Sequence, residues 1–325
     1  MMNVKEWILN APGDVLLDKT TLDKNVKDDF VRVETQFSAI SVGTEVAAYK
    51  GISPLRPVTN AYPRKVGYCN VGRVKEVGSN VSGLSSGDLI YSHASHCSAY
   101  DISNEEVLAV IPETVFAPHA ALCYLYHLGF SALHASELKS GNSCVFIGGG
   151  NLSLHAEQMF SASGIDVDII SEFSSSSAIG EGSQIFSRKE AANSREQYDA
   201  VIIFSNSWQD YLLALKLANF RGILVLVGFP GRGQTSSNFN PLDSQFVYDK
   251  QLTIRACGRN DTDQIGRQEV KDRCKMIIND ISEQILDASI LLDKVVAWES
   301  LPKIYLELSE NSPRTGTIVL DWRGA

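Results

Sequence analysis

The spacing of apolar and polar positions changes near residue 110. Before that point, short runs of β-branched and aromatic residues stand between Gly, Asn and Ser, which is typical of strands joined by turns. The runs that we expect to be strands are residues 31–40, 71–78, 87–92 and 98–103. This half of the pattern indicates an antiparallel β domain with a barrel-like architecture.

Beyond residue 110 the pattern becomes that of an α/β protein. We expect helices at 117–139, 151–163 (closed by Gly164), 208–220 and, after residues 250–258, 265–281, and strands at 143–148, 167–170, 199–205 and 222–229. Alternating strands and helices predict a parallel sheet wound by right-handed crossovers. Its strands are apolar without alternation, as expected when both faces are covered. Short strands return at the end, and the last one, 315–322, is expected to rejoin the first domain.

Length and composition fit two soluble domains. A chain of 325 residues, 44% hydrophobic and 21% charged, can bury a large core. We expect one domain from residues 1–118 and 260–325, and a second from residues 119–259. The fold class is therefore α/β.

The net charge restricts the partners. A charge of −9 disfavours nucleic acid and anionic membranes, although backbone N–H groups can still bind an anionic cofactor. We see no signal-peptide pattern and no apolar run of about 20 residues, so we expect a cytoplasmic protein. The six cysteines form no C-x-x-C pair, which argues against a zinc ribbon or a redox motif.

One glycine-rich loop carries the main functional signal. In "VFIGGGNLSLHA" (145–156), Gly148 and Gly150 fit the first two positions of G-x-G-x-x-G, and Ser153 takes the third. The first glycine permits the tight turn and the second lets backbone approach a pyrophosphate. We expect a phosphate cradle that includes Asn151 and Leu152; the alternative is a turn that binds nothing.

The end of the next strand bears on the choice of cofactor. The acid that binds the ribose of NAD is replaced by Ser171, and Glu172 follows it. A serine hydroxyl suits the 2′-phosphate of NADP, whereas Glu172 suits NAD, so both cofactors stay open with a lean to NADP. No base follows until Arg188 and Lys189, and the serines at 174–177 equally suit a solvated loop or a helix cap.

With "LVLVGFPG" leading to "KQLTIRACG", and "PRTGTIVLD" near the end, nearly the whole chain resembles the medium-chain dehydrogenase/reductase superfamily. The resemblance implies a GroES-like β-barrel catalytic domain plus a Rossmann doubly wound parallel sheet, with the cofactor in the cleft between them and contacts from Gly228 and Phe229. It also implies a homodimer. "SAISVGTEVAAYKG" is similar to the alcohol-type branch that includes bacteriochlorophyllide dehydrogenase.

Compared with zinc-binding members, this sequence departs at the ligand positions. Ser41 or Val42 replaces the first cysteine, Tyr68 and Cys69 replace the His-Glu pair, and the third ligand position falls at His127. Because zinc needs three ligands of Cys, His or carboxylate type, we expect a zinc-free protein without a metal. "SHASHC" (92–97) is expected to be a loop packed near the cleft.

The resemblance implies three catalytic residues: Thr44 as a proton relay, Tyr68 pointing into the former zinc space, and His127 as an acid or base. Glu45 is expected to give structural support. Each has a structural alternative: Thr44 capping a turn, Tyr68 filling space, and His127 as a core histidine. Arg56, Arg64 and Lys65 suit an anionic substrate or plain solvation.

The sequence therefore predicts a metal-independent NAD(P)-dependent oxidoreductase acting on a small-molecule carbonyl, alcohol or activated alkene. The alternative is a non-catalytic scaffold or ligand sensor with a degenerate site.

Overall fold

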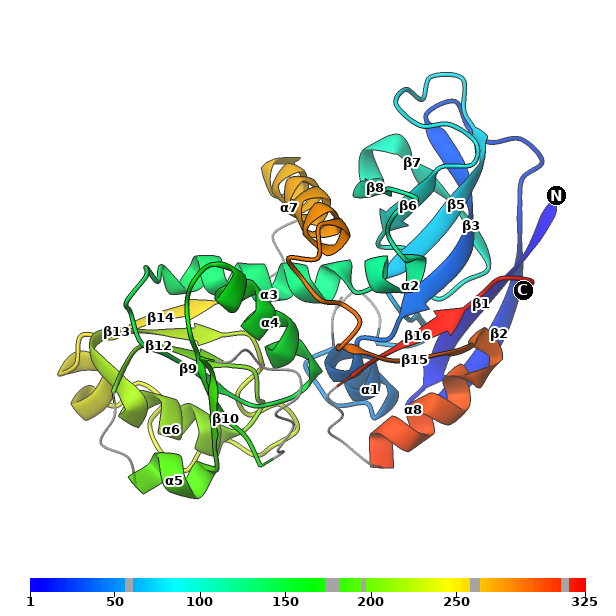
Figure 1. Ribbon diagram of the computed structural model, residues 1–325. Coiled ribbons are helices and arrows are strands. Elements are labelled where there is room, and N and C mark those ends of the chain that lie inside the picture. Colours follow the sequence, from blue (N-terminus) through cyan, green and yellow to red (C-terminus); the bar gives the residue numbers. More distant parts are fainter. Residues whose placement is uncertain (56–60, 173–181, 194–196, 258–263, 311–315) are drawn as a thin grey trace. The chain divides into compact units, whose positions relative to one another are not determined.

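The computed structural model describes residues 1–55, 61–172, 182–193, 197–257, 264–310 and 316–325 (Figure 1). The chain forms two compact units. Unit 1 comprises Met1–Tyr124 and Asn260–Ala325, and unit 2 comprises Leu125–Arg259. Arg56 and the serines at 174–177 lie outside the described residues.

Unit 1 is built on two sheets. A three-stranded sheet has the order β2-β1-β4, and a seven-stranded sheet has the order β15-β16-β3-β5-β6-β8 with β7 on β3. Every strand pair in them is antiparallel except β15 with β16. The strands are β1 (Met2–Ala11), β2 (Asp14–Leu22), β3 (Phe30–Ala39), β4 (Arg64–Lys65), β5 (Asn70–Val77), β6 (Leu89–Ser92), β7 (Ala99–Ser103), β8 (Ala109–Ile111), β15 (Leu292–Ala297) and β16 (Thr317–Asp321).

The four strands predicted in this region are confirmed as β3, β5, β6 and β7. The prediction that the last strand returns to the β-rich region is confirmed as well, because β16 pairs with β3 through Val319 and Ala39. Buried Val31, Val33, Val74 and Ile90 form an apolar core beneath β3, β5 and β6.

The helices of unit 1 are α1 (Val42–Tyr49), α2 (Ala117–Ala120), α7 (Gln264–Ser282) and α8 (Leu301–Glu310). The predicted polar helix is confirmed as α7. The expectation of only short strands after it was incomplete, because α8 buries Leu301, Ile304, Tyr305 and Leu308. This spacing of three and four residues places all four on one helical face.

Unit 2 is a six-stranded parallel sheet in the order β11-β10-β9-β12-β13-β14. Numbered from β9 as the first strand, this order is 3-2-1-4-5-6, that of a dinucleotide-binding sheet. Its elements are β9 (Cys144–Ile147), α4 (Asn151–Ala162), β10 (Asp168–Ile170), β11 (Gln184–Phe186), α5 (Arg188–Asn193), β12 (Tyr198–Ile203), α6 (Trp208–Leu217), β13 (Ala218–Leu226) and β14 (Thr253–Ala256).

Both faces of this sheet are covered, as its unbroken apolar strands predict. On β9, Cys144 and Phe146 pack with Ala132 of α3 (Cys123–Ser136) and Phe160 of α4. The alternate residues Val145 and Ile147 pack into a second core with α5 and α6. The predicted fold class, a β-barrel-type domain plus a doubly wound parallel sheet, is confirmed (Figure 1).

Two predicted helices end earlier than expected. The segment 117–139 forms two helices, α2 and α3, and α3 stops at Ser136 before Glu137 adopts φ 51°. Helix α6 stops at Leu217 because Ala218 is extended and already pairs with Tyr198 as the first residue of β13. In the described part of the chain, no helix is long and apolar enough to cross a membrane.

Candidate functional site

The glycine loop forms the turn between β9 and α4. Gly148 has φ 111°, a conformation that side chains disfavour, and its N–H donates to the Ile170 carbonyl at 2.9 Å. A Cβ on Gly149 would lie 2.3 Å from the Ser171 hydroxyl oxygen. A Cβ on Gly150 would meet no described atom within 4 Å. Ser171 therefore fills the space next to Gly149, whereas the space next to Gly150 is empty of described atoms. Gly150 is the position at which a phosphate would have to approach the backbone.

Helix α4 starts at this opening. Gly150 is its N-cap residue and no side chain caps it in the described structure. Ser153, at the third glycine position, is 1% exposed and its hydroxyl donates to the Gly150 carbonyl at 2.7 Å. Ser153 therefore links the first turn of α4 to its N-cap residue by a side-chain hydrogen bond. Asn151 and Leu152 form the rest of that turn, at the positive end of the helix dipole.

The carboxyl end of β10 carries an ion-pair network. The Arg188 guanidinium binds the buried carboxylate of Asp210 through two hydrogen bonds, of 2.6 and 2.9 Å. Glu172 accepts the Arg188 backbone N–H at 3.0 Å and lies 3.6 Å from its side chain. Arg188, distant from Ser171 in sequence, therefore folds back beside this strand end. Both Arg188 and Glu172 remain partly exposed, at 38% and 51%.

Gly228 and Phe229 follow β13 at the same edge of the sheet. A Cβ on Gly228 would lie 2.2 Å from the Ser205 carbonyl oxygen, so only glycine fits between the two loops. The Phe229 N–H donates to the Asn206 side chain at 2.8 Å. All eight residues predicted to bind the cofactor therefore lie in loops or at a helix start beyond the carboxyl ends of β9, β10 and β13. In parallel sheets this edge, at the point where the strand order reverses, is the usual site for ligands.

In unit 1, a cluster of hydroxyl groups brings together two of the predicted catalytic residues. The Tyr68 phenol donates a hydrogen bond to the Ser41 hydroxyl, and the Thr44 side chain lies close enough to the phenol to lower its pKa. Ser41 is the N-cap of α1 and Thr44 lies in its first turn, so one helix start supplies both partners. Burial raises the pKa of the Tyr68 phenol well above its usual value, and the nearby Glu45 carboxylate adds to this. Tyr68 therefore stays protonated and acts as a donor.

Glu45 lies next to this cluster and holds it through hydrogen bonds, which is the structural role predicted for it. Its carboxylate is 3% exposed, accepts the Ser41 N–H at 2.7 Å and also accepts the Tyr305 hydroxyl. The His96 Nε2 lies 3.0 Å from the same carboxylate, and the His96 Nδ1 lies 2.7 Å from the Ser38 hydroxyl. His96 belongs to the segment "SHASHC", for which only a packing role was predicted. We regard it as the main site residue that the sequence did not reveal.

Two further rings surround Tyr68. The His93 Nδ1 lies 3.0 Å from the Tyr68 carbonyl oxygen, and the His93 ring meets Tyr124 edge-on with centroids 4.4 Å apart. Tyr124 also meets the Tyr68 ring edge-on at 5.5 Å. Aromatic contacts of this geometry fix the phenol's orientation.

His127, the third predicted catalytic residue, lies in unit 2 on α3, where it is 1% exposed. The structure thus groups Thr44 with Tyr68 within one unit and places His127 in the other. Among the described residues, no group of three His, Cys, Asp or Glu side chains is arranged to hold a metal ion.

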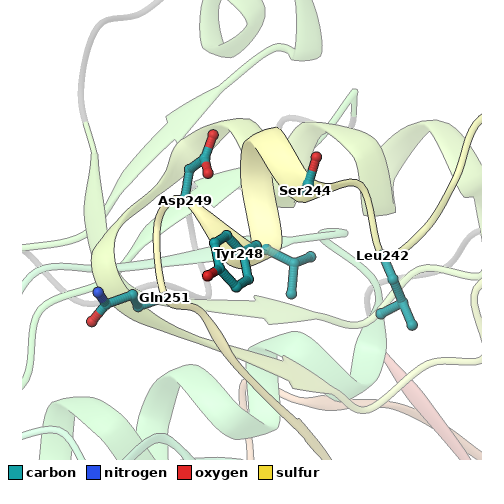
Figure 2. Close-up of a pocket in the computed structure, with 6 residues that line it drawn as sticks. Leu242, Ser244, Tyr248, Asp249 and Gln251 are labelled. Carbon is teal, nitrogen blue, oxygen red and sulfur yellow. The ribbon is translucent and has the colours of Figure 1, made fainter.

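A separate surface hollow lies on unit 2, around the short helical turn Ser244–Tyr248 (Figure 2). None of the predicted site residues lines it. Its walls are Leu242, Ser244, Val247, Tyr248, Asp249 and Gln251.

No family model matches the chain. An uncharacterized zinc-type alcohol dehydrogenase-like protein of Haemophilus influenzae is 24% identical, over 95% of this chain and 96% of that protein. Among solved structures, 2R,3R-butanediol dehydrogenase from Bacillus subtilis has a TM-score of 0.78 at 16% identity, with 98% of this chain and 99% of that one covered.

Two cofactor-bound structures are similar to the same degree. An E. coli alcohol dehydrogenase complexed with NADH has a TM-score of 0.79 at 14% identity, covering 99% of this chain and all of that one. The CAD of Helicobacter pylori complexed with NADP(H) has a TM-score of 0.76 at 15% identity, covering all of this chain and 99% of the other. Along its whole length, the chain therefore has the fold of the zinc-type alcohol dehydrogenase-like proteins.

Proposed function

We propose that the protein is an NAD(P)-dependent oxidoreductase that transfers a hydride between nicotinamide and a small carbonyl, alcohol or activated alkene without a catalytic zinc. The observation that carries this proposal is the open space at Gly150 before the uncapped start of α4, at the reversal point of a 3-2-1-4-5-6 sheet. Relatives of the same fold bind NADH or NADP(H).

The glycine loop fits a dinucleotide pyrophosphate. The space that a Cβ of Gly150 would fill is empty of described atoms, so backbone can approach a phosphate there. The first turn of α4, with Asn151 and Leu152, adds backbone N–H groups and the positive end of the helix dipole. Glycine at 148 and 228 lets the neighbouring loops pack closely, because a Cβ at either position would meet Phe204 and Ser205.

The experiment that tests the cradle is fluorescence titration of the purified protein with NADPH. Gly150→Asp places a carboxylate into the open space, so we expect unchanged thermal stability and loss of measurable NADPH binding. Gly150→Ala is the matched variant without charge and should weaken binding less. Unchanged affinity in Gly150→Asp would contradict the cradle, and a wild type that binds neither NADPH nor NADH would favour the non-catalytic scaffold.

The lean to NADP rests on the end of β10. Ser171 leaves this strand end without the acid that would repel a 2′-phosphate, and Asp210 holds Arg188 at the same strand end, next to Glu172, with its guanidinium partly exposed. Glu172, which pairs with Arg188, would oppose that phosphate. We therefore expect Glu172→Gln to tighten NADPH binding and to leave NADH binding unchanged in parallel titrations. The reverse pattern would indicate NAD.

When bound, the cofactor supplies or accepts the hydride, and the chain's own groups must handle the proton. The single O–H of the protonated Tyr68 phenol donates to Ser41 in the free protein, and it can turn from Ser41 to a substrate oxygen as negative charge develops on that oxygen. Ser41, which is hydrogen-bonded to the phenol, and Thr44, which lies near it, can return a proton to Tyr68. We assign the acid role to Tyr68 and the relay to Thr44; an acid or base role for His127 stays a prediction.

The donor chemistry at the position of the catalytic zinc does not fit the ion. Ser41 or Val42 replaces the cysteine ligand and Tyr68 replaces the histidine ligand, and Tyr68 is hydrogen-bonded to Ser41. We therefore propose that hydrogen-bond donation by Tyr68 takes over the stabilisation of the oxyanion. Elemental analysis of the purified protein should find no stoichiometric zinc; one zinc per chain would overturn this assignment.

A further inference from the structure

We propose that His96 is the positioning residue for the hydroxyl cluster: it fixes Thr44 and Tyr68 relative to each other without touching the substrate. This inference rests on the proposed function of these two residues. The inference is based on one fully buried imidazole, that of His96. It contacts both chain segments that supply the cluster: helix α1 through Glu45, and the residues before Tyr68 through Gly67.

Toward the first segment, His96 acts through Glu45. Its Nε2 lies 3.0 Å from the Glu45 carboxylate, which in turn holds the Ser41 N–H at 2.7 Å. Glu45 follows Thr44 directly in α1, and Ser41 is the N-cap of the same helix. A change at His96 therefore reaches both hydroxyl partners of the phenol through one carboxylate.

Toward the second segment, His96 acts through backbone. Its N–H donates to the Val66 carbonyl at 2.7 Å, and its ring lies so close to Gly67 that a Cβ there would be 2.7 Å from the imidazole. Gly67 immediately precedes Tyr68. The imidazole therefore packs against the backbone of Gly67, the residue that precedes Tyr68, and limits where that backbone can lie.

A neutral His96 ring allows a proton arrangement that satisfies every group of this network. The Trp322 indole N–H can only donate, and it binds the Ser38 hydroxyl oxygen at 2.8 Å. The Ser38 hydroxyl can then donate to the His96 Nδ1, which leaves Nε2–H to donate to Glu45. Glu45 accepts from His96, Tyr305 and Ser41, so its charge is held by three donors. A ring with both nitrogens engaged and no exposed surface is suited to holding geometry.

Two substitutions separate the contacts of the ring. His96→Gln retains an amide donor near the Nε2 position and can still reach Glu45, whereas His96→Asn retains a polar group near Nδ1 and cannot. Both lose the ring that supports Gly67, so both should lower the melting temperature. The exposed His134 in α3 gives the matched control, His134→Gln.

The experiment uses the full-length protein with NADPH and a panel of aldehydes, ketones and quinones. We expect His96→Asn to lower kcat about tenfold or more, with KM and NADPH affinity within about twofold of wild type. His96→Gln should recover part of kcat at a similar melting temperature. If kcat stays at the wild-type level in both variants, or falls equally in both, His96 has only a structural role and the proposal is wrong.

A second measurement is independent of turnover. In protein labelled with 13Cζ-tyrosine, the Tyr68 resonance is identified by its loss in Tyr68→Phe. It should shift in His96→Asn and shift less in His96→Gln, because the phenol's hydrogen bonds change only when Glu45 is released. If the wild type binds NADPH but turns over no substrate, the proposed function fails, and this resonance still decides the positioning role: an unmoved signal would refute it.

Discussion

Gly149 is the residue of the loop whose substitution is easiest to interpret, because a side chain faces it. A Cβ there would lie 2.3 Å from the Oγ and 2.5 Å from the Cβ of Ser171. We expect Gly149→Ala to lower the free energy of unfolding by about 1–3 kcal/mol, the usual cost of overpacking. Denaturant titration measures this.

A double variant distinguishes a steric collision with Ser171 from backbone strain in the loop as the cause of the lost stability. Gly149→Ala combined with Ser171→Gly removes the colliding side chain, so stability should return most of the way. Failure of the second change to rescue the first would mean that the loop requires glycine at 149 for its backbone conformation instead.

His155 predicts a pH dependence of stability. It is fully buried in α4, its Nδ1 lies 2.8 Å from the Asn151 carbonyl oxygen, and its Nε2 has no hydrogen-bond partner among the described residues. Burial lowers its pKa to about 4. Between pH 6.5, the ordinary pKa of histidine, and pH 4, His155 is largely protonated in the unfolded chain and largely neutral in the folded chain.

The stabilising contribution of neutral His155 is therefore complete above pH 6.5 and lost as pH falls toward 4, by about 3 kcal/mol in total. His155→Phe keeps a ring against Tyr126 but cannot titrate. We expect its unfolding free energy, measured in urea at pH 7, 6 and 5, to fall less steeply than that of wild type. Parallel slopes for the two proteins would refute this assignment; exposed His134→Gln should match wild type.

At the scale of elements, α3 and α4 approach each other closely. A Cβ on Gly129 of α3 would lie 2.7 Å from the Ala156 Cα and 3.0 Å from its backbone nitrogen. The obstacle is backbone, so the two helices would have to separate. We expect Gly129→Ala to destabilise the protein by about 1–3 kcal/mol despite alanine's better helix propensity.

Shortening the facing side chain, Ala156, should not restore the stability lost in Gly129→Ala. The pair of Gly149 and Ser171 differs in this respect. Ala156→Gly removes only the Cβ at 3.2 Å and leaves the backbone atoms in place. Thermal unfolding of Gly129→Ala with and without Ala156→Gly checks this, and a full rescue would show that the contact is made by side chains.

The elements that could be predicted are those whose burial leaves a regular pattern. The strands of unit 2 are covered on both faces, so their unbroken apolar runs and the helices between them were readable. Helix α1 was missed because its eight residues include Gly43 and Thr44 and give little periodic signal. Helix α8 does carry the helical spacing, but it is short and lies between two strands.

The site was predictable where one short segment forms it. The glycine loop and the start of α1 are local, so their residues were named from spacing and resemblance. Arg188 and His96 were not assigned because they reach the site by tertiary folding: Arg188 through the β10–β11 pairing, and His96 through a loop that follows β6. Sequence spacing carries no signal for such contacts.

At the scale of the whole molecule, we expect a homodimer formed through unit 2. Strand β14 ends the order of its sheet, and among the described strands it pairs with β13 alone, so its outer edge is open. Near it in sequence, Leu242 and Tyr248 are 66% and 80% exposed beside the hollow of Figure 2. An open edge beside exposed apolar side chains is a common site for pairing between copies.

Light scattering after gel filtration tests this expectation. Wild type should have twice the 35.6 kDa of one chain, and the double variant Leu242→Lys with Tyr248→Lys should move toward one chain. The control is Ile265→Lys, an equally exposed residue of α7 that is 75% exposed. A wild-type monomer would end the dimer proposal, and dissociation by the control variant would relocate the interface.

The pairing of β16 with β3 bears on how the protein is made in the cell. A ribosome releases β3 early and β16 only after all of unit 2, a delay of roughly 15–55 s at ordinary rates of translation. Trp322, which closes the Ser38–His96 network, emerges later still. Unit 2 can therefore fold on the ribosome while the nascent β-rich half waits with an open strand edge. During that interval the nascent chain is most exposed to aggregation and most dependent on chaperones.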